Sequence, residues 1–347
     1  MSAGVDRREF LQVSMAAGTL LVAGAATKTN AMAQGIGRIA EVEKATIWFL
    51  ADNYYDANRA DTKITKRYRS LPGKSMRAEH GLSFYIQTVM NGTTSTCMFD
   101  YALDPAVVIN NAALLGLDLG KPNAFGLSHG HYDHFTGAVA VLKQNQGRIA
   151  AGTPFYVGEE AFAHRYSVRP GNPEPQDLGQ LKREDLEALG VKVVEISEPT
   201  EIIPGVYSTG KIARVTPYEK IPPTFLIDRG AAREQDDFRG EQALFLNVKG
   251  KGLLVVSGCA HSGIVNAVKQ AQKVANTDRL HAVMGGFHLI NAKPELINST
   301  VAEIKAMRPD HIVPAHCTGF EAIVLFSREM PDQFTMNTAG TQYTFPV

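Results

Sequence analysis

The chain has 347 residues, which is enough for one large domain or two ordinary ones. Its 44% hydrophobic and 20% charged residues are typical of a soluble globular protein. Basic and acidic residues balance to a formal net charge of zero, which argues against nucleic acid or an anionic membrane as the main partner. The three cysteines, Cys97, Cys259 and Cys317, predict no disulfide framework.

Residues 1–33 are predicted to be an export signal rather than part of the fold. The segment 6–12 reads DRREFLQ and precedes an apolar stretch at 13–26, which is shorter than the about 20 residues that span a bilayer. Residues 31–33 form a small-x-small cleavage site. The pattern resembles a twin-arginine signal. That resemblance implies the twin-arginine export machinery as a partner, a mature chain beginning near Gln34 in a periplasm or outside the cell, and no stable membrane anchor.

Strands and helices are predicted in alternation along residues 34–347. Short apolar runs bounded by Gly, Asn or Asp have strand length, at Ala45–Leu50, Leu82–Val89, Thr96–Phe99, Ala124–Leu127, Leu244–Val248 and Leu253–Val256. Helical patterns lie at Pro105–Leu115, Gly137–Gln144, Gly263–Val274 and Pro294–Met307. The Gly-containing segment 249–252 joins two of the strands and predicts a hairpin. Strands mixed with helices throughout indicate a single layered α/β domain.

The stretch 152–239 differs in composition from the rest of the chain. It is richer in proline and charge, as in RPGNPEP at 169–175, and it holds a predicted helix at Gln180–Leu189. We interpret it as a cap-like insertion over one edge of the domain rather than as a second core. Two interpretations remain: a surface insertion without function, or a segment that shapes the substrate site.

The segment Ser128–Phe135 reads SHGHYDHF and places four ligand-type side chains within six positions. His129 and His131 are two residues apart after a predicted strand, so in an extended segment they can point the same way and grip one ion. Asp133 and His134 lie further round the turn and can face a second ion. Burying such a group without a metal would leave polar atoms in need of partners. The nitrogen and carboxylate set suits zinc, and iron and manganese accept it too.

A strand, the H-x-H-x-D-H motif and a helix beginning near Gly137 together resemble the metallo-β-lactamase fold, a four-layer αβ/βα sandwich with its metal site at the strand ends. The family's next ligand is often a histidine in a short turn, where this chain has Asp237; His261 is the candidate that could replace it. The family's bridging aspartate is matched in position by Cys259, a softer ligand. Its last histidine is matched by His316, which the resemblance makes a ligand of the second metal.

Six short motifs in chain order resemble one subgroup of that family, named after the archaeal dihydropterin–ribofuranosylaminobenzene 5′-phosphate synthase. They are LADN (50–53), AEHGLS (78–83), LSHGHYDH (127–134), SGCAHSGIVN (257–266), GGFHL (285–289) and PAHCTG (314–319). Together they cover nearly the whole mature chain. The motifs imply the subgroup's fold and metal site. The subgroup's name is a much weaker indication of the substrate of this protein.

Further candidates surround these motifs. His288, after two glycines, could bind substrate, donate a proton or touch metal, although a core histidine is the competing interpretation. Asp100 resembles the family's aspartate that orients the metal-binding loop. His80 either supports a ligand or has no role there, and Cys317 either packs or coordinates. The remaining His and Cys residues are expected to be structural: Cys97, His164, His281 and His311.

The main functional hypothesis is an exported hydrolase with two metal ions that activate water for attack on an ester, amide or phosphoester of a small molecule. Asp133 and His288 are the predicted catalytic residues, with Asp133 also moving a proton. No serine nucleophile elbow and no Walker-type loop occurs in the sequence. The first alternative is a metal-dependent transferase or synthase for a phosphorylated ribosyl or pterin-like compound, with Arg214 or Lys220 anchoring phosphate. The second alternative is a non-catalytic metal-binding or redox protein.

Overall fold

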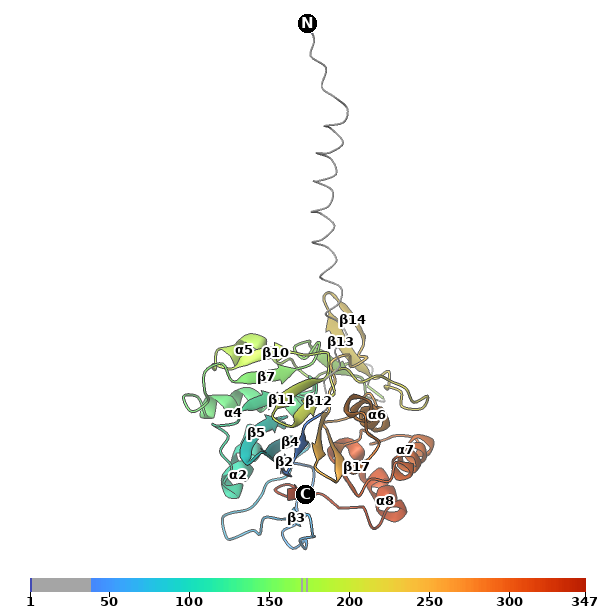
Figure 1. Cartoon of the computed structure of the whole chain (residues 1–347). Helices are drawn as coiled ribbons and strands as arrows, with labels where there is room; N and C mark the ends of the chain where they lie inside the picture. The colour runs from blue at the N-terminus through green and yellow to red at the C-terminus, as the bar shows by residue number, and fades with distance from the viewer. Residues whose placement is uncertain (2–38, 170, 173) are drawn as a thin grey trace. The chain divides into compact units, whose positions relative to one another are not determined.

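A computed structural model describes residues 1, 39–169, 171–172 and 174–347. The predicted export signal and its cleavage site lie outside the described residues. Within the described part of the chain, no helix is long and apolar enough to cross a membrane. The strands of the described residues form three sheets, and helices lie beside the two larger ones (Figure 1).

The larger sheet has eight strands and is buried on both faces. Its order is β10 (Lys192–Glu195), β7 (Pro154–Val157), β6 (Ala124–Gly126), β5 (Thr93–Phe99), β4 (Ser83–Met90), β2 (Lys44–Ala51), β19 (Gln342–Pro346) and β3 (Thr65–Lys66). Side chains alternate along β2: Ile47 and Phe49 belong to one core cluster, Trp48 and Leu50 to the other. Because successive strand residues point to opposite faces, this sheet separates two cores.

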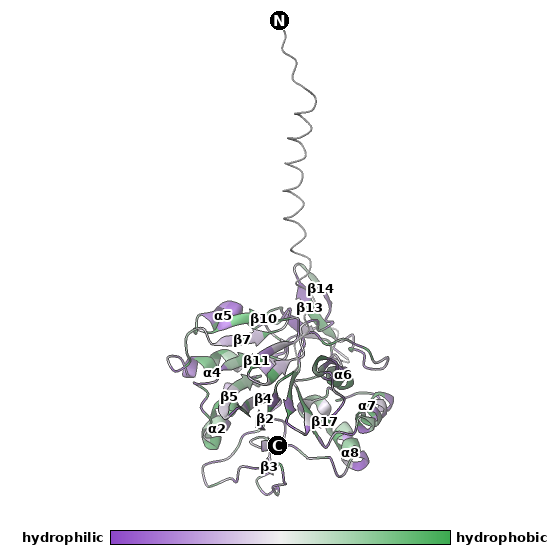
Figure 2. Ribbon diagram, in the orientation of Figure 1, coloured by the Kyte–Doolittle hydropathy of each residue, from purple (hydrophilic) through white to green (hydrophobic). Residues whose placement is uncertain are grey.

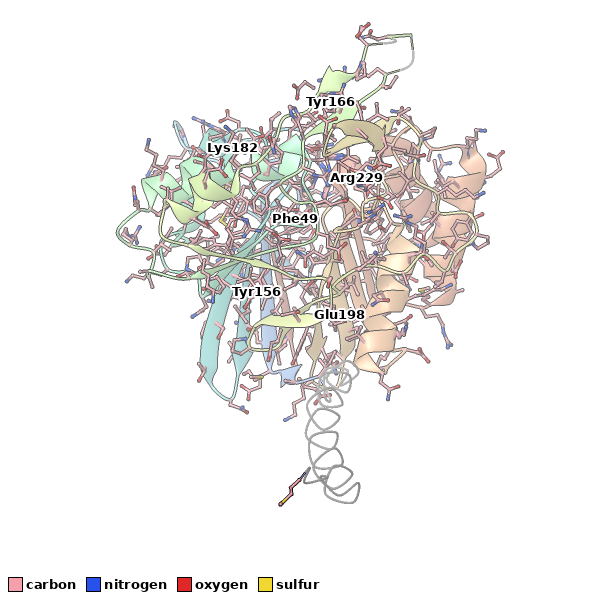
Figure 3. All side chains as sticks on the ribbon, turned by 90° about the horizontal axis from the view of Figure 1, so that it is seen from above. Phe49, Tyr156, Tyr166, Lys182, Glu198 and Arg229 are labelled. Carbon is pink, nitrogen blue, oxygen red and sulfur yellow. The ribbon has the colours of Figure 1, made fainter. Side chains whose placement is uncertain are left out.

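The second sheet has seven strands and shares a core with the first. Its order is β11 (Thr200–Ile203), β12 (Val206–Ser208), β15 (Leu244–Val248), β16 (Gly252–Ser257), β17 (Leu280–Gly286) and β18 (His311–Ala315), and β1 (Glu41–Val42) pairs with β15. Leu246, Leu254 and Met284 from this sheet belong to the same cluster as Phe49. Phe49 is fully buried, and Figure 3 labels it near the middle of the view.

Helices cover the outer faces of both large sheets. They are α2 (Pro105–Leu115), α3 (Tyr132–Phe135), α4 (Ala138–Gln144), α5 (Arg183–Glu187), α6 (Ile264–Ala275), α7 (Pro294–Ala306) and α8 (Phe320–Glu329). Helices α2, α4 and α5 lie beside the first sheet, and α6, α7 and α8 beside the second (Figure 1). In Figure 2, α5 is mainly hydrophilic and the neighbouring β10 hydrophobic, as expected of a helix on a solvent face. The predicted layered α/β class is confirmed.

The stretch 152–239 contributes to all three sheets. Strands β7 and β10 extend the first sheet, and β11 and β12 extend the second. A third, four-stranded sheet has the order β14 (Ala232–Gln235), β13 (Phe225–Arg229), β8 (Arg165–Ser167) and β9 (Gln176–Asp177). Figure 3 places Tyr166 and Arg229, from β8 and β13, in this region. The part outside the two large sheets is therefore narrower than the predicted insertion.

Most predicted elements match the structure within a few residues. The hairpin is present, because β15 and β16 pair antiparallel across residues 249–251. Helix α2 begins after Asp104, whose carboxylate accepts a hydrogen bond from the Ala106 N–H at 2.8 Å, and ends at Gly116 with φ 69°. The predicted helix at 180–189 was too long, since α5 covers only Arg183–Glu187. Leu181 is buried before the helix begins, so packing rather than helical periodicity fixes that segment.

Candidate metal centre

The predicted ligands follow strands whose carboxyl ends meet at one end of the two large sheets. His129 and His131 come after β6, Cys259 and His261 after β16, and His316 directly after β18. Strands β16, β17 and β18 run parallel, so their carboxyl ends share one edge of the second sheet. Strand β6 runs parallel to β5 in the first sheet. A site at such strand ends is the usual arrangement in layered α/β proteins.

Three imidazoles form the first ligand group, which we call the three-histidine group: His129, His131 and His261. Their ring centroids lie 4.7–4.8 Å apart, and the Nε2 atoms of His129 and His261 are 3.2 Å apart. The buried His131 Nε2 and His261 Nδ1 have no hydrogen-bond partner among the described residues. Burial, reinforced for His129 and His261 by neighbouring histidines, lowers the pKa of all three imidazoles well below its usual value. They are therefore neutral near pH 7, the form that binds metal.

The second ligand group consists of His134, Cys259 and His316, with Asp133 beside it. His134 Nε2 lies 3.0 Å from Cys259 Sγ, and one oxygen of Asp133 lies 3.3 Å from His316 Nε2 and 3.9 Å from His134 Nε2. Burial opposes ionisation of Asp133, but His134 and His316 hold its pKa well below the ordinary range. Burial also opposes the charge on His316, yet Cys317 and Asp133 raise its pKa to about 9. Metal binding at this group would therefore displace a proton.

Cys259, a member of the second group, also lies within reach of the three-histidine group. Its sulfur lies within 4.8 Å of ligand nitrogens of His129 and His261, and equally within 4.8 Å of those of His134 and His316. The bridging position that the sequence assigned to Cys259 thus lies between the two groups. Nitrogen, sulfur and carboxylate donors around buried, unpartnered ring nitrogens fit divalent transition metals, with thiolate favouring softer ions such as zinc. The residues present fit a metal centre.

Asp100 holds the H-x-H-x-D-H loop in place. This fully buried carboxylate accepts hydrogen bonds from the Ser128 backbone N–H at 2.7 Å and from the Ser128 hydroxyl at 2.8 Å, and it lies 2.7 Å from His134 Nδ1. Because Nδ1 of His134 faces Asp100, Nε2 is the nitrogen that faces Cys259. Asp100 has a φ of 61°, a conformation that aspartate tolerates better than most residues. The contacts are those expected of an orienting aspartate.

Two further carboxylates accept hydrogen bonds from the backbone beside the ligands, and neither was predicted as a site residue. Asp52 accepts the His316 backbone N–H at 2.8 Å, and Glu241 accepts the N–H groups of His261 at 2.7 Å and Ser262 at 2.6 Å. Asp52 directly follows β2 and lies within the LADN motif, which is a signal that sequence analysis could have used. Glu241 has no local signal, because its partners lie 20 and 21 residues further along the chain.

Of the other polar candidates, His80 and His288 lie beside the ligand groups, whereas Asp237 lies outside them. His80 stacks on His316 with ring centroids 4.8 Å apart, and its Nε2 lies 3.4 Å from Asp133. The His288 ring centroid is 4.1 Å from that of His261, and its buried Nδ1 has no partner among the described residues. Asp237 belongs to neither ligand group; it is 41% exposed and forms ion pairs with Arg229 and Arg239.

The histidines and cysteine expected to be structural lie away from both groups. His164 Nε2 is 2.6 Å from Asp177, and His281 Nδ1 is 2.7 Å from Asp310. His311 lies near His281, with ring centroids 5.3 Å apart. Cys97 is fully buried in the core between the sheets.

A cleft of about 150 Å³ opens beside the centre, and a larger cavity of about 670 Å³ continues from it. His261, His288 and Phe225 line both, so the two spaces meet at the ligand groups. Phe225 lies on β13 and its ring centroid is 5.1 Å from that of His131. The small third sheet therefore forms one wall of the cleft. Lys220 lines the larger cavity, whereas Arg214 lies elsewhere and donates to the backbone carbonyl of Asp237.

The chain is similar over most of its length to a curated archaeal enzyme. It is 30% identical over 304 residues to the 7,8-dihydropterin-6-methyl-4-(β-D-ribofuranosyl)-aminobenzene-5′-phosphate synthase of Methanocaldococcus jannaschii, covering 87% of this chain and 97% of the relative. This chain belongs to the family of that synthase. A second relative of this synthase-family chain is an uncharacterized protein of the same archaeon, 29% identical over 259 residues, covering 74% of this chain and 90% of the relative. No family model matches the chain.

A solved structure agrees with the predicted superfamily. The crystal structure of Tm1679, a metal-dependent hydrolase of the β-lactamase superfamily, matches with a TM-score of 0.66 and 26% identity, covering 87% of this chain and 99% of that one. The predicted metallo-β-lactamase fold is therefore confirmed. This member of the synthase family therefore belongs to a superfamily of enzymes, and its candidate metal centre lies at the strand ends.

Proposed function

We propose that this protein is a hydrolase that uses two metal ions, zinc being the best fit, on an ester, amide or phosphoester of a small molecule. The observation that carries the proposal is the pair of ligand groups that share Cys259 and open onto a cleft. The likeness to a metal-dependent hydrolase at 26% identity supports it. Bound metal would supply a water of lowered pKa and polarise the reacting oxygen of the substrate.

The chain's own residues would divide the remaining tasks. Asp133 lines the cleft beside His134 and His316, so it is suited by its position to accept a proton during attack and to return it to the leaving group. His288 reaches the junction of cleft and cavity with an unpartnered ring nitrogen, so it is suited to contact the substrate. Phe225 and Phe238 pack against the three-histidine group and limit the access of water to it.

Removal of metal is expected to abolish turnover. The purified full chain should contain about two equivalents of metal, because the two ligand groups are distinct. Dialysis against a chelator should lower both the metal content, measured by inductively coupled plasma mass spectrometry, and the hydrolysis of a panel of lactam, lactone, thioester, sulfate and phosphodiester substrates. Zinc, manganese or ferrous iron added back should restore turnover. Metal-free protein with full activity on any of these substrates would overturn the proposal.

A second candidate function is a synthase-type reaction on a phosphorylated ribosyl or pterin-like compound. It is favoured by the 30% identity to the curated synthase, whose name includes such a compound. Lys220 lines the 670 Å³ cavity together with His261 and His288 and could meet a phosphate there. Metal-loaded protein that hydrolyses none of the panel would favour this candidate over the hydrolase.

The Lys220→Ala variant separates the two candidates. If a phosphate docks in the cavity, its KM for a phosphorylated ribosyl substrate should rise roughly tenfold, since loss of a charge-assisted contact of about 1.4 kcal/mol is tenfold in affinity. The KM for the dephosphorylated compound should not change. Arg214→Ala is the matched control, because Arg214 contacts Asp237 away from the cavity. An equal change in both variants, or in neither, counts against the synthase-type candidate.

A further inference from the structure

Two buried cysteines lie in contact at the metal centre. The sulfurs of Cys259 and Cys317 are 3.3 Å apart, and both side chains are at most 3% exposed. All three cysteines are free thiols, and Cys97 sits apart in the core between the sheets. A disulfide has a sulfur–sulfur length of about 2.05 Å, so the pair would need to close by little more than 1 Å.

The fold brings these cysteines together across strand β17. Cys259 follows β16 and Cys317 lies in the 3₁₀ turn His316–Thr318 after β18, and β17 runs between these two strands. Gly286 ends β17 at this point. A Cβ there would lie 2.8 Å from Cys317 Sγ and 3.3 Å from Cys259 Cα, so the glycine leaves the room in which the sulfurs meet. A contact between residues 58 positions apart thus depends on one small residue.

The two cysteines differ in their relation to the metal ligands. Cys259 lies within ligand distance of both the three-histidine group and the second group. Among the described residues, Cys317 is a member of neither group, and its sulfur lies within 4.8 Å of ligand atoms of Cys259 and His288. Cys317 is therefore a neighbour of the shared ligand, and a bond to it would take Cys259 away from both groups.

We propose that Cys259 and Cys317 are a redox pair whose oxidation to a disulfide withdraws Cys259 from the metal centre. The oxidant would be a low-molecular-weight disulfide that reaches the pair from the 150 Å³ cleft, which both cysteines line. One thiolate attacks the oxidant and releases one small thiol, and the second then displaces the other. The protein pair loses two electrons and two protons, and the oxidant is reduced to two thiols. The two protons leave on the two small thiols.

The pair is tested first in the metal-free full chain, where no ligand competes for Cys259. The protein is incubated with oxidised glutathione under native conditions and then unfolded in the presence of iodoacetamide. Of the three cysteines, Cys97 alone should be labelled, and a Cys259–Cys317 linked peptide should appear in the non-reduced digest. Dithiothreitol should return all three thiols. Three alkylated cysteines after oxidation would overturn the proposal without bearing on the hydrolase or synthase function.

The metal-loaded protein tests the link to the centre. Oxidised glutathione should release metal in step with disulfide formation, followed with a colorimetric zinc chelator, and metal should protect the pair by slowing its oxidation. Cys317→Ser should hold as much metal as the wild type and keep it in the presence of oxidant. Cys97→Ser is the control and should behave as the wild type. A disulfide that forms with metal fully retained, or a reduced Cys317→Ser variant that has lost its metal, would contradict the proposal.

Discussion

In an Asp133→Asn variant, turnover is expected to fall by about 10²–10⁴-fold, the range for loss of a positioned general acid–base group. The amide keeps the volume of the side chain but cannot accept a proton or carry the charge. In the native protein this carboxylate oxygen lies 3.3 Å from His316 Nε2 and 3.4 Å from His80 Nε2. Steady-state kinetics on the substrate found in the panel, together with the metal content of the same sample, measure the effect.

Asp237→Asn is the matched control for that experiment. Asp237 stands where the superfamily often has a histidine, but it is 41% exposed and belongs to neither of the two ligand groups. Loss of its exposed ion pairs should cost about 1 kcal/mol or less in stability and leave turnover within about twofold. A large drop in metal content in Asp237→Asn, with full turnover in Asp133→Asn, would show that the centre is built differently from our assignment.

Replacement of Asp100 by asparagine is expected to weaken metal binding by about 10–100-fold and to lower the free energy of unfolding by about 1–3 kcal/mol. The charge on Asp100 serves three contacts at once, two with Ser128 and one with His134. An amide can no longer accept from all of them, and its own N–H₂ would face a buried donor. Asparagine also tolerates the φ of 61°, so backbone strain does not add to the effect.

Urea unfolding of the metal-free protein and metal titration of the folded protein separate the two consequences. Asp104→Ala is the control, because Asp104 caps helix α2 through Ala106 and lies outside both ligand groups. It should cost about 1 kcal/mol in stability with no change in metal affinity. If Asp100→Asn leaves metal affinity unchanged, the orienting role of Asp100 is wrong.

Local sequence was sufficient for the first half of the centre. His129 and His131 alternate on an extended segment after β6, and Asp133 and His134 open helix α3, so their relative placement depends on short-range geometry. Burial of so many ligand-type groups requires partners, and this made metal the simplest explanation from the sequence alone. The layered α/β class could also be predicted from the sequence, because strand and helix periodicities depend on neighbours within a few residues.

Only the tertiary structure shows how the distant residues of the centre, which the sequence named through a family resemblance, come together. His134 meets Cys259 across 125 positions and His129 meets His261 across 132, contacts that depend on how two sheets pack and not on any local period. The same packing brings Asp52 and Glu241 beneath the ligands, sets Asp237 apart, and brings Cys317 against Cys259. Residue types and their order along the chain therefore determined that the protein can bind metal. The packing of the strand ends determined which side chains lie close enough to bind it together.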